Sequence, residues 1–293
     1  CSPLRSLAKS RFIASHVHQQ MLALPGRDHL QEFLVFVALH RLVDRAEFRP
    51  QHVADRRAFR EEIERIAQIR ADRDIRGLVL MSNKPGSFLA GADIALFDGC
   101  TQALAAEQMV RGVQAGFAGF ATLKIPVVAA VEGICMGGGL ELALVCDARV
   151  AADTPATRFA MPEVRLGLLP AAGGTQRLPR LVGIGESLDL MLTGRTLSPV
   201  QARMMGLIDA HVPADELLDT AIARARRQAK RDLLKHGSWR RTLQTRVSHG
   251  RAGMARLALE DNAPGRHLLF AQARTRSRAR SGGHYPAIDR IID

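Results

Sequence analysis

The stretch Pro126-Val-Val-Ala-Ala-Val-Glu-Gly-Ile-Cys-Met-Gly-Gly-Gly-Leu-Glu-Leu-Ala143 decides the fold. Its apolar run Pro126–Val131 predicts a buried strand, and the glycines after it predict a tight turn into an apolar helix from Gly138 to about Cys146. The same criteria predict further strands at 78–81 and 148–152 and a helix at 103–123. Strands that are apolar throughout and alternate with helices are typical of a mainly parallel sheet covered by helices, so we predict an α/β fold.

The overall composition is that of a globular protein with a substantial core. The chain has 293 residues, of which 47% are hydrophobic and 24% charged, which excludes a disordered tail, a collagen-like fibre and a disulfide miniprotein. No uncharged apolar run approaches the roughly 20 residues of a membrane-spanning helix. The four cysteines form no CxxC pair and have no metal-ligand spacing. We therefore expect no metal site, no disulfide framework and a reducing compartment.

The net charge of +12 favours anionic partners: nucleic acid, anionic lipid or phosphate-bearing small molecules. Much of it lies in the basic runs 224–231 and 274–280, which as a default are solvated helix faces. Aromatic residues make up only 4% of the chain, and base stacking by single-strand binders needs aromatics. We therefore expect no nucleic-acid partner.

Residues 1–55 form an irregular N-terminal segment in which few elements are recognisable. The run Phe33–Leu39 is compatible with a strand, and a helix is predicted from Asp55 to Gln68. Residues Cys1–Gly26 lack acids and resemble a mitochondrial presequence in composition. A disordered N-terminus explains the same composition equally simply.

The segment Glu132–Glu141 is the first that carries chemistry. Backbone N–H groups at a helix start are unsatisfied and form the positive end of the helix dipole, so a glycine turn there can hold an anion or an oxyanion that forms during a reaction. Glu141 lies three residues after Gly138 and can face the same cleft. A nucleotide phosphate loop is the competing interpretation, but the Lys-Ser/Thr that it needs is missing.

Two further segments, Ser87–Ile94 and Met161–Pro179, have the same mixture of small residues and carboxylates. In the first, Gly91 can adopt positive φ, although a plain strand-to-helix turn explains the segment as well. In the second, Glu163 is either a second acid–base group or a salt-bridge partner. Two carboxylates beside an oxyanion site suggest acid–base chemistry on a carbonyl compound. Because HExxH, GxSxG and a complete dinucleotide fingerprint are missing, metal or serine hydrolysis and NAD binding are disfavoured.

Together these segments resemble the crotonase (enoyl-CoA hydratase/isomerase) superfamily, and within it most closely the hydratase half of the fatty-acid β-oxidation complex α-subunit. The resemblance covers about residues 56–293. It rests on the segments Lys84–Asp93, Gly137–Ala143, Gly173–Gly183, Leu190–Arg195, Gly206–Asp209 and Gly282–Ala287. It implies a crotonase-like ββα superhelix over 56–212, followed by a basic helical C-terminal region over 213–293.

The resemblance also implies roles for individual residues. The backbone N–H groups of Ala92 and Gly138 form the oxyanion hole for the thioester oxygen. Glu141 activates water, and Glu163 delivers or removes the C2 proton. The substrate-binding positions that it implies are Ala90, Gly91, Asp93, Gly137 and Ala171. The implied reaction is the hydration of trans-2-enoyl-CoA to 3-hydroxyacyl-CoA in β-oxidation, with isomerisation between the Δ3 and Δ2 enoyl-CoA as a side activity.

No cofactor and no metal are implied, since the substrate is itself a CoA thioester. The implied partners are a thiolase or dehydrogenase, in a homo-oligomer or multienzyme complex. The implied location is the cytoplasm of a bacterium or the mitochondrial matrix of a eukaryote. Two departures from the family pattern stand out: its opening strands are not recognisable before Asp55, and Ala171 replaces its first glycine in Pro-Gly-x-Gly-Gly. The alternative function is a truncated, inactive homologue that only binds acyl-CoA or a partner subunit.

Overall fold

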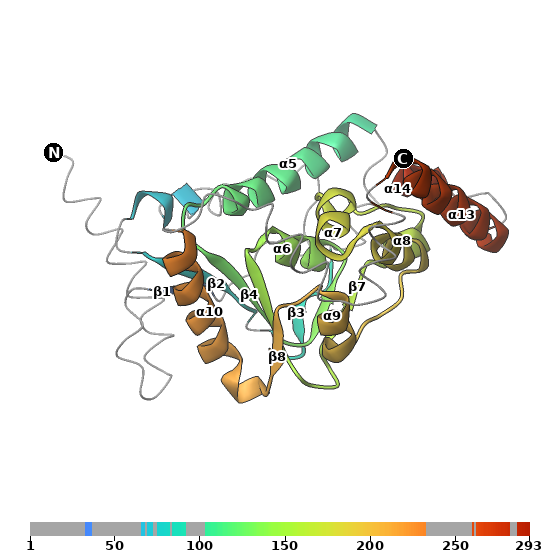
Figure 1. Cartoon of the computed structure of the whole chain (residues 1–293). Coiled ribbons are helices and arrows are strands. Elements are labelled where there is room, and N and C mark those ends of the chain that lie inside the picture. Colours follow the sequence, from blue (N-terminus) through green and yellow to red (C-terminus); the bar gives the residue numbers. More distant parts are fainter. Residues whose placement is uncertain are drawn as a thin grey trace.

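Two parallel sheets form the centre of the molecule, which is described here from a computed structural model (Figure 1). The structure describes residues 33–36, 66–67, 69–72, 75–82, 84–91, 103–232, 260, 262–281 and 286–293. The N-terminal presequence-like stretch, most of the helix predicted over 55–68 and most of the segment 282–287 lie outside these residues. The predicted division of the chain at 55/56 and 212/213 stays a prediction.

The larger sheet has the strand order β1-β2-β4-β6-β8, and every neighbouring pair is parallel. Its strands are β1 (Phe33–Phe36), β2 (Gly77–Leu80), β4 (Val127–Val131), β6 (Ala148–Ala152) and β8 (Ala210–Val212). The predicted parallel sheet and the strands at 78–81, 126–131 and 148–152 are confirmed, the first two shifted or shortened by one residue. The strand at Phe33 is also present, so part of the N-terminal segment pairs with the edge of this sheet.

The smaller sheet has three parallel strands in the order β3-β5-β7. They are β3 (Ser87–Leu89), β5 (Ile134–Met136) and β7 (Arg158–Ala160). The sequence does not predict this sheet, because strands of three residues are too short to show an alternating pattern. Its position matters, since β3 and β5 lead directly into the two glycine-containing turns of the site.

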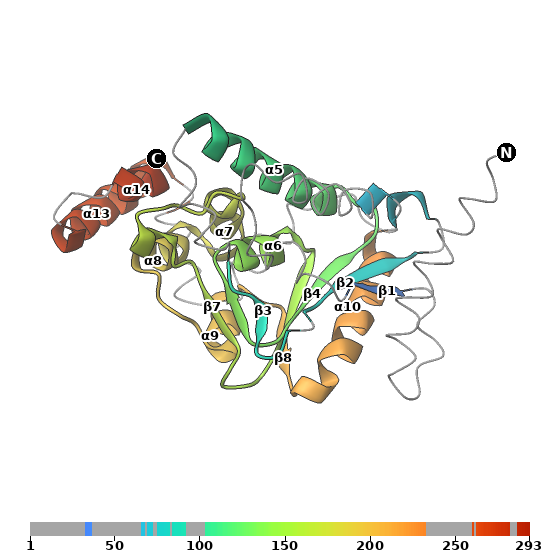
Figure 2. The same cartoon turned by 180° about the vertical axis from the view of Figure 1, so that it is seen from behind.

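Helices cover both faces of the larger sheet and extend beyond it (Figures 1 and 2). The helix α10 (Leu217–Asp232) covers one face, whereas α5 (Ala103–Ala121), α6 (Gly138–Val145) and α7 (Gly174–Val182) lie on the other side. The remaining helical elements are η1 (Glu163–Leu166), α8 (Ile184–Thr193), α9 (Pro199–Met205), η2 (Ala214–Glu216), α13 (Ala263–Ser281) and α14 (Pro286–Ile292). The helices predicted at 103–123 and 138–146 are therefore confirmed.

Side chains of the sheet alternate between two apolar cores, as successive residues of a strand must. In β2, Leu78 and Leu80 belong to the core that includes α6 and α7, whereas Val79 belongs to the core under α10. On α10 the side chains in this second core are Leu217, Ala221, Ile222 and Ala225. Because both faces are buried, every residue of β2, β4 and β6 is buried, and this explains why β2 and β4 are unbroken apolar runs. In β6 the buried Arg149 interrupts the apolar run, and its guanidinium donates hydrogen bonds to backbone carbonyl oxygens.

The C-terminal helices α13 and α14 pack against each other, and both contact α8. Ile288, Ile291 and Ile292 of α14 are buried in the larger core. Within the part of the chain that the structure describes, no helix is long and apolar enough to cross a membrane.

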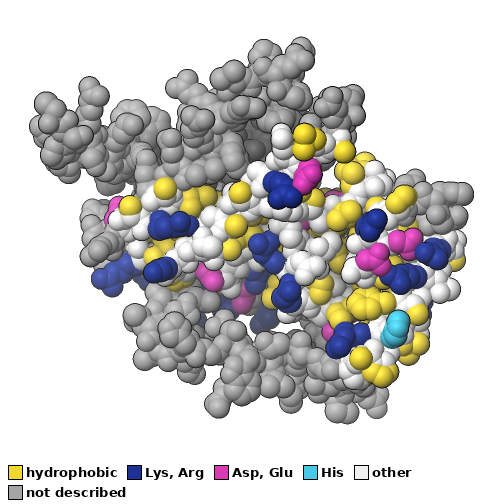
Figure 3. Space-filling view, turned by 90° about the horizontal axis from the view of Figure 1, so that it is seen from above, with side chains coloured by type: hydrophobic (Ala, Val, Ile, Leu, Met, Phe, Trp, Pro, Cys, Tyr) yellow, Lys and Arg dark blue, Asp and Glu magenta, His cyan; other side chains and the backbone are white. Residues whose placement is uncertain are grey.

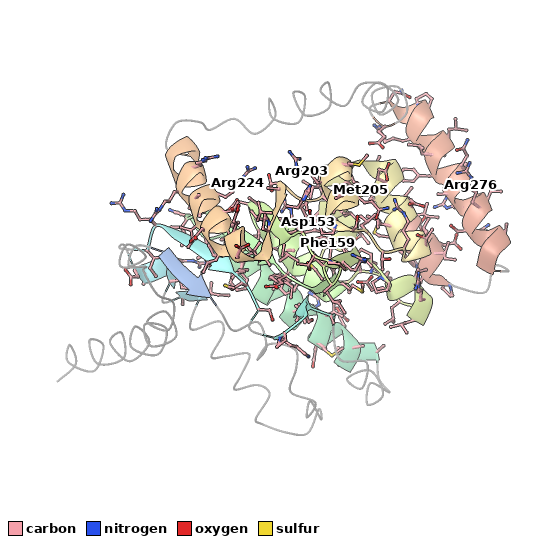
Figure 4. All side chains as sticks on the ribbon, turned by 90° about the horizontal axis from the view of Figure 1, so that it is seen from below. Asp153, Phe159, Arg203, Met205, Arg224 and Arg276 are labelled. Atoms are coloured by element: carbon pink, nitrogen blue, oxygen red, sulfur yellow. The ribbon has the colours of Figure 1, made fainter. Side chains whose placement is uncertain are left out.

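The basic residues that the structure describes in the C-terminal third are spread over more than one face. Figure 4 shows Arg224 on α10 and Arg276 on α13 at opposite ends of the molecule. Arg224 pairs with Asp209, and Arg274 and Arg278 pair with Asp293 and Asp289. The view from above shows Lys and Arg side chains interspersed with acidic and apolar ones (Figure 3). The charge of the described residues is thus distributed over several surfaces.

Close packing of β3 against α6 depends on Gly139. A Cβ atom at this position would lie 2.1 Å from the Leu89 carbonyl oxygen, which is backbone and cannot move aside alone. We expect Gly139→Ala to lower the free energy of unfolding by about 1–3 kcal/mol, as overpacking of a core does. Urea unfolding measures this. The control is Gly185→Ala in α8, where the new methyl meets only Glu260 Oε1 at 3.7 Å. A Gly139→Ala protein as stable as this control would contradict the packing described.

Candidate active site

The turn between β5 and α6 presents the start of a buried helix to the site. Gly137 caps α6 with a φ of +55° and donates its N–H to the Ala160 carbonyl oxygen at 3.0 Å. The first intrahelical bond runs from the Glu141 N–H to the Gly137 carbonyl oxygen at 2.9 Å. The N–H of Gly138 therefore belongs to the unpaired first turn of α6 and can serve a bound anion.

Glu141 lies one turn into α6 with only 3% of its surface exposed. Its Oε1 accepts hydrogen bonds from the Ala172 N–H at 2.8 Å and the Gly174 N–H at 2.7 Å. A Cβ at position 174 would lie 2.9 Å from Oε1, so only glycine lets the backbone approach this closely. One oxygen is therefore fixed by the loop before α7, and the carboxylate has a defined orientation.

Glu163 begins the short helix η1, immediately after β7 and Pro162. Its Oε1 approaches Gly137 so closely that a Cβ there would be 3.2 Å away. Both carboxylate oxygens are buried, and neither has a hydrogen-bond partner among the described residues. Buried polar atoms in folded proteins are nearly always hydrogen-bonded, so an unpaired pair of oxygens marks a position kept open for a ligand or reactant. The alternative prediction was a salt bridge of Glu163, and none is formed with the described residues.

The turn after β3 brings a second backbone segment to the same place. Gly91 has a φ of +99°, and its Cα would lie 3.7 Å from a Cβ at Gly137. Ala90 and Gly91 also line a small open hollow together with Ser82, Lys84, Ser87, Phe88 and Leu89. Ala92 and Asp93 lie outside the described residues. The predicted oxyanion pair is therefore seen on one side only, through Gly138.

The pKa values of the two carboxyl groups are both raised, mainly by burial. For Glu163 the pKa rises from 4.5 to about 7, and the nearby Glu141 carboxylate adds to the effect. For Glu141 burial also raises the pKa, but the N–H groups of Gly174 and Ala172 and the positive charge of Arg177 oppose it. The two carboxyl groups thus lie in different surroundings, since only Glu141 has amide and cationic partners that favour its ionised form, and such a difference suits acid–base catalysis.

The structure brings together most of the predicted site residues. Gly91 and Glu163 both approach Gly137, which leads into the first turn of α6 with Gly138 and Glu141. Ala171 lies in the loop that binds Glu141. Ala171 itself offers its carbonyl oxygen to the Nε2 of Gln114 at 2.7 Å. Among the described residues, no group of three or more His, Cys, Asp or Glu side chains could hold a metal ion.

Several residues at the site were not predicted. Ala172 and Gly174 bind Glu141, Gln114 and Arg177 contact the loop that carries them, and Arg149 binds the end of α6. Arg177 and Gly174 lie within the quoted segment Gly173–Gly183, so that segment was a signal for them. Gln114 is an exposed residue of a long helix, and nothing in the local sequence distinguishes it.

Comparison with known proteins identifies this arrangement. The profile of the enoyl-CoA hydratase/isomerase family matches residues 50–262. The chain belongs to this family. A fatty acid oxidation complex subunit alpha of Shewanella loihica is 44% identical over 252 residues, which are 85% of this chain and 32% of the relative. That of Shewanella halifaxensis is 46% identical over 231 residues, 78% of this chain and 30% of the relative. This member of the family thus spans about a third of the length of the curated relatives that it matches.

Solved structures of the enoyl-CoA hydratase/isomerase fold agree. Pseudomonas aeruginosa DspI has a TM-score of 0.56 and 32% identity, over 71% of this chain and 83% of the other. An enoyl-CoA hydratase from Bacillus anthracis has a TM-score of 0.55 and 29% identity, over 76% and 79% of the two chains. The crotonase-like fold predicted from the sequence is confirmed, and with it the assignment to the crotonase superfamily.

The raised pKa of Glu163 predicts a stability that falls as pH rises. Between about 4.5 and about 7 this carboxyl group is ionised in the unfolded chain but protonated in the folded one, so unfolding is favoured increasingly until pH exceeds 7. Glu163→Gln removes this contribution. We expect the difference in unfolding free energy between pH 5 and pH 8 to shrink by up to about 3 kcal/mol in this variant. Urea unfolding at both pH values measures it.

Glu107→Gln is the matched control, because Glu107 is exposed on α5 and pairs with the exposed Arg111 of the same helix. The control variant keeps the pH dependence of the parent protein. An identical pH dependence in Glu163→Gln and the parent would show that Glu163 is ionised normally in the folded state.

Proposed function

We propose that this chain is an enoyl-CoA hydratase, which adds water to trans-2-enoyl-CoA and gives 3-hydroxyacyl-CoA in fatty-acid β-oxidation. The observation that carries the proposal is the pair of buried carboxyl groups, Glu141 and Glu163, at a glycine-lined helix start. The carboxylate of Glu141 is fixed by two amides, and that of Glu163 has no hydrogen-bond partner within the described part of the chain. Membership of the enoyl-CoA hydratase/isomerase family supports it.

In this reaction the two glutamates have different roles. Glu141, ionised and held through Oε1, orients a water molecule with its other oxygen and takes one of its protons as the water oxygen bonds to C3. Glu163, which is protonated in part near neutral pH, gives a proton to C2. The elements of water are thereby added across the double bond without any oxidation or reduction, and no redox cofactor is needed. This division matches the rule that an acid and a base with separated pKa values share one site.

The thioester oxygen gains negative charge as C3 is attacked, and the start of α6 is suited to stabilise it. We assign the Gly138 N–H to this oxygen, with the Ala92 N–H as the second donor from the β3 side. Fixed donors in other enzymes each contribute about 3–4 kcal/mol to such a transition state. Ala90, Gly91, Asp93, Gly137 and Ala171 are proposed to contact the substrate around this oxygen and the catalytic water.

The raised pKa of Glu163 favours isomerisation as a second activity. A carboxyl group with a pKa near 7 can both take a proton from carbon and return it. Glu163 could therefore carry a proton between C2 and C4 of a 3-enoyl-CoA, moving the double bond into conjugation. A 3-enoyl-CoA substrate tests this directly, since the conjugated product absorbs and the substrate does not.

Partners follow from the names of the relatives. The Shewanella proteins are subunits of a fatty acid oxidation complex, and we propose that this chain also works in a homo-oligomer or a multienzyme complex with a thiolase or dehydrogenase. Hydration produces a secondary alcohol at C3, which an NAD-dependent dehydrogenase then oxidises. Direct transfer of this alcohol to the dehydrogenase is a chemical reason for such an assembly.

Hydration of crotonyl-CoA tests the proposal. We expect the parent protein to convert it to 3-hydroxybutyryl-CoA, and Glu141→Gln and Glu163→Gln each to lower kcat by about 100-fold or more, because each removes a general acid–base group. Loss of the conjugated thioester absorbance gives the rate, and mass spectrometry identifies the product.

The exposed carboxylate variant Glu107→Gln serves as the control and keeps full activity. If the parent protein is folded and binds crotonyl-CoA but does not hydrate it, the chain is an inactive acyl-CoA-binding homologue and the proposal is wrong.

A further inference from the structure

The loop 170–174 is held from two sides by side chains that do not themselves touch Glu141. Gln114 on α5 donates from Nε2 to the Ala171 carbonyl oxygen at 2.7 Å. Arg177 on α7 donates from Nη1 to the Ala172 carbonyl oxygen at 2.8 Å. The loop lies between these two contacts, and its N–H groups at 172 and 174 bind Glu141 Oε1.

The contact from Gln114 acts on the very peptide group that binds Glu141. The carbonyl of Ala171 and the N–H of Ala172 belong to one planar peptide unit, so fixing the oxygen fixes the direction of the N–H. A hydrogen bond accepted by the carbonyl also polarises the unit and strengthens the bond that its N–H donates. Gln114, Ala171, Ala172 and Glu141 thus form a chain of two successive hydrogen bonds from the surface to the buried carboxylate.

The contact from Arg177 acts on the next peptide group and adds a charge. Gly173, with a φ of +104°, leaves the space that the guanidinium occupies, because a Cβ there would lie 2.2 Å from Nη1. Arg177 is partly buried and stabilises the ionised form of Glu141. Arg180, three residues further along the same helix, is exposed, and its side chain donates hydrogen bonds to Gln176.

We propose that Gln114 and Arg177 are positioning residues for hydration: Gln114 orients the Ala172 N–H, and Arg177 fixes the adjacent peptide and keeps Glu141 in its charged, water-activating form. The proposal rests on the proposed function of Glu141 as the group that activates water. It assigns a role to an exposed residue of α5 that lies 57 positions from the peptide on which it acts.

Two variants separate the geometric role from the charge. With crotonyl-CoA as substrate, we expect Gln114→Leu to lower kcat about ten-fold, because the Glu141 carboxylate is misaligned. KM and the acid limb of the kcat/KM pH profile should stay unchanged. We expect Arg177→Met to lower kcat at least as much and also to move the acid limb upward by about half a pH unit or more, because a cation beside Glu141 is lost. Arg177→Lys keeps the charge and restores the position of the acid limb.

Matched controls lie on the same two helices. Gln108→Leu removes an exposed amide from α5, and Arg180→Met removes an exposed cation from α7. Both keep the kcat and the pH profile of the parent protein. Thermal unfolding of all five variants shows whether a lower kcat merely follows a lower Tm, in which case Gln114 and Arg177 are structural residues and the proposal fails.

A titration without substrate keeps this test separate from that of the proposed function. The carboxyl resonance of Glu141 is followed by NMR in protein labelled with 13C-glutamate, and is assigned by its disappearance in Glu141→Gln. We expect its midpoint to rise in Arg177→Met and to stay in Gln114→Leu and Arg180→Met. An unchanged midpoint in Arg177→Met overturns the role of Arg177 whether or not the protein hydrates crotonyl-CoA. A parent protein without hydratase activity but with the expected midpoints overturns only the function of the site.

Discussion

Most of the site depends on how one oxygen atom, Oε1 of Glu141, is held. Two backbone N–H groups reach it from the loop before α7, while its own helix begins at the glycine turn after β5. These two hydrogen bonds therefore join α6 to the loop before α7, and β6, β7 and η1 lie between them in the chain. Gly174 permits the approach, since any side chain there would collide with the carboxylate. Because the first turn of α6 and the loop are fixed together, the unpaired N–H groups and the second carboxylate oxygen of Glu141 have defined directions.

Among the described residues, the carboxyl oxygens of Glu163 are buried without a hydrogen-bond partner, and this arrangement costs stability. The pKa of Glu163 is raised to about 7. A carboxyl group in such surroundings stays partly protonated near neutral pH, which costs free energy on ionisation but supplies a proton donor. Burial also raises the pKa of Glu141, but two amides and a cation oppose this effect. The two glutamates thus differ in their partners, and under the proposed function that difference distinguishes the base from the acid.

Apolar runs made β2, β4 and the helix α6 predictable, because these elements are buried and contain few polar residues. The strand β8 has three half-buried residues, one of them His211, and gave no such signal. The smaller sheet was not predictable. Its strands have three residues each, and β5 is half exposed at its first residue, so neither length nor alternation gives a signal. At the site, Glu141 and Glu163 could be predicted because each is a carboxylate within a segment of glycines and apolar residues. Gln114 was not, because its contact joins residues 57 positions apart and only the folded chain brings them together.

A helix of eight residues such as α6 has little stability of its own, so its position is set by contacts at both ends. At the C-terminal end Arg149, which is 6% exposed, donates to the carbonyl oxygens of Cys146 at 2.7 Å and Ala143 at 3.3 Å. The same guanidinium donates to the Leu207 carbonyl oxygen at 2.8 Å, and Asp209 provides the opposite charge. A cation at this end complements the helix dipole, and the glycine turn leaves the first N–H groups at the positive end without helical partners. The buried arginine thus stabilises the C-terminal end of the helix whose N-terminal end forms the glycine turn of the candidate site.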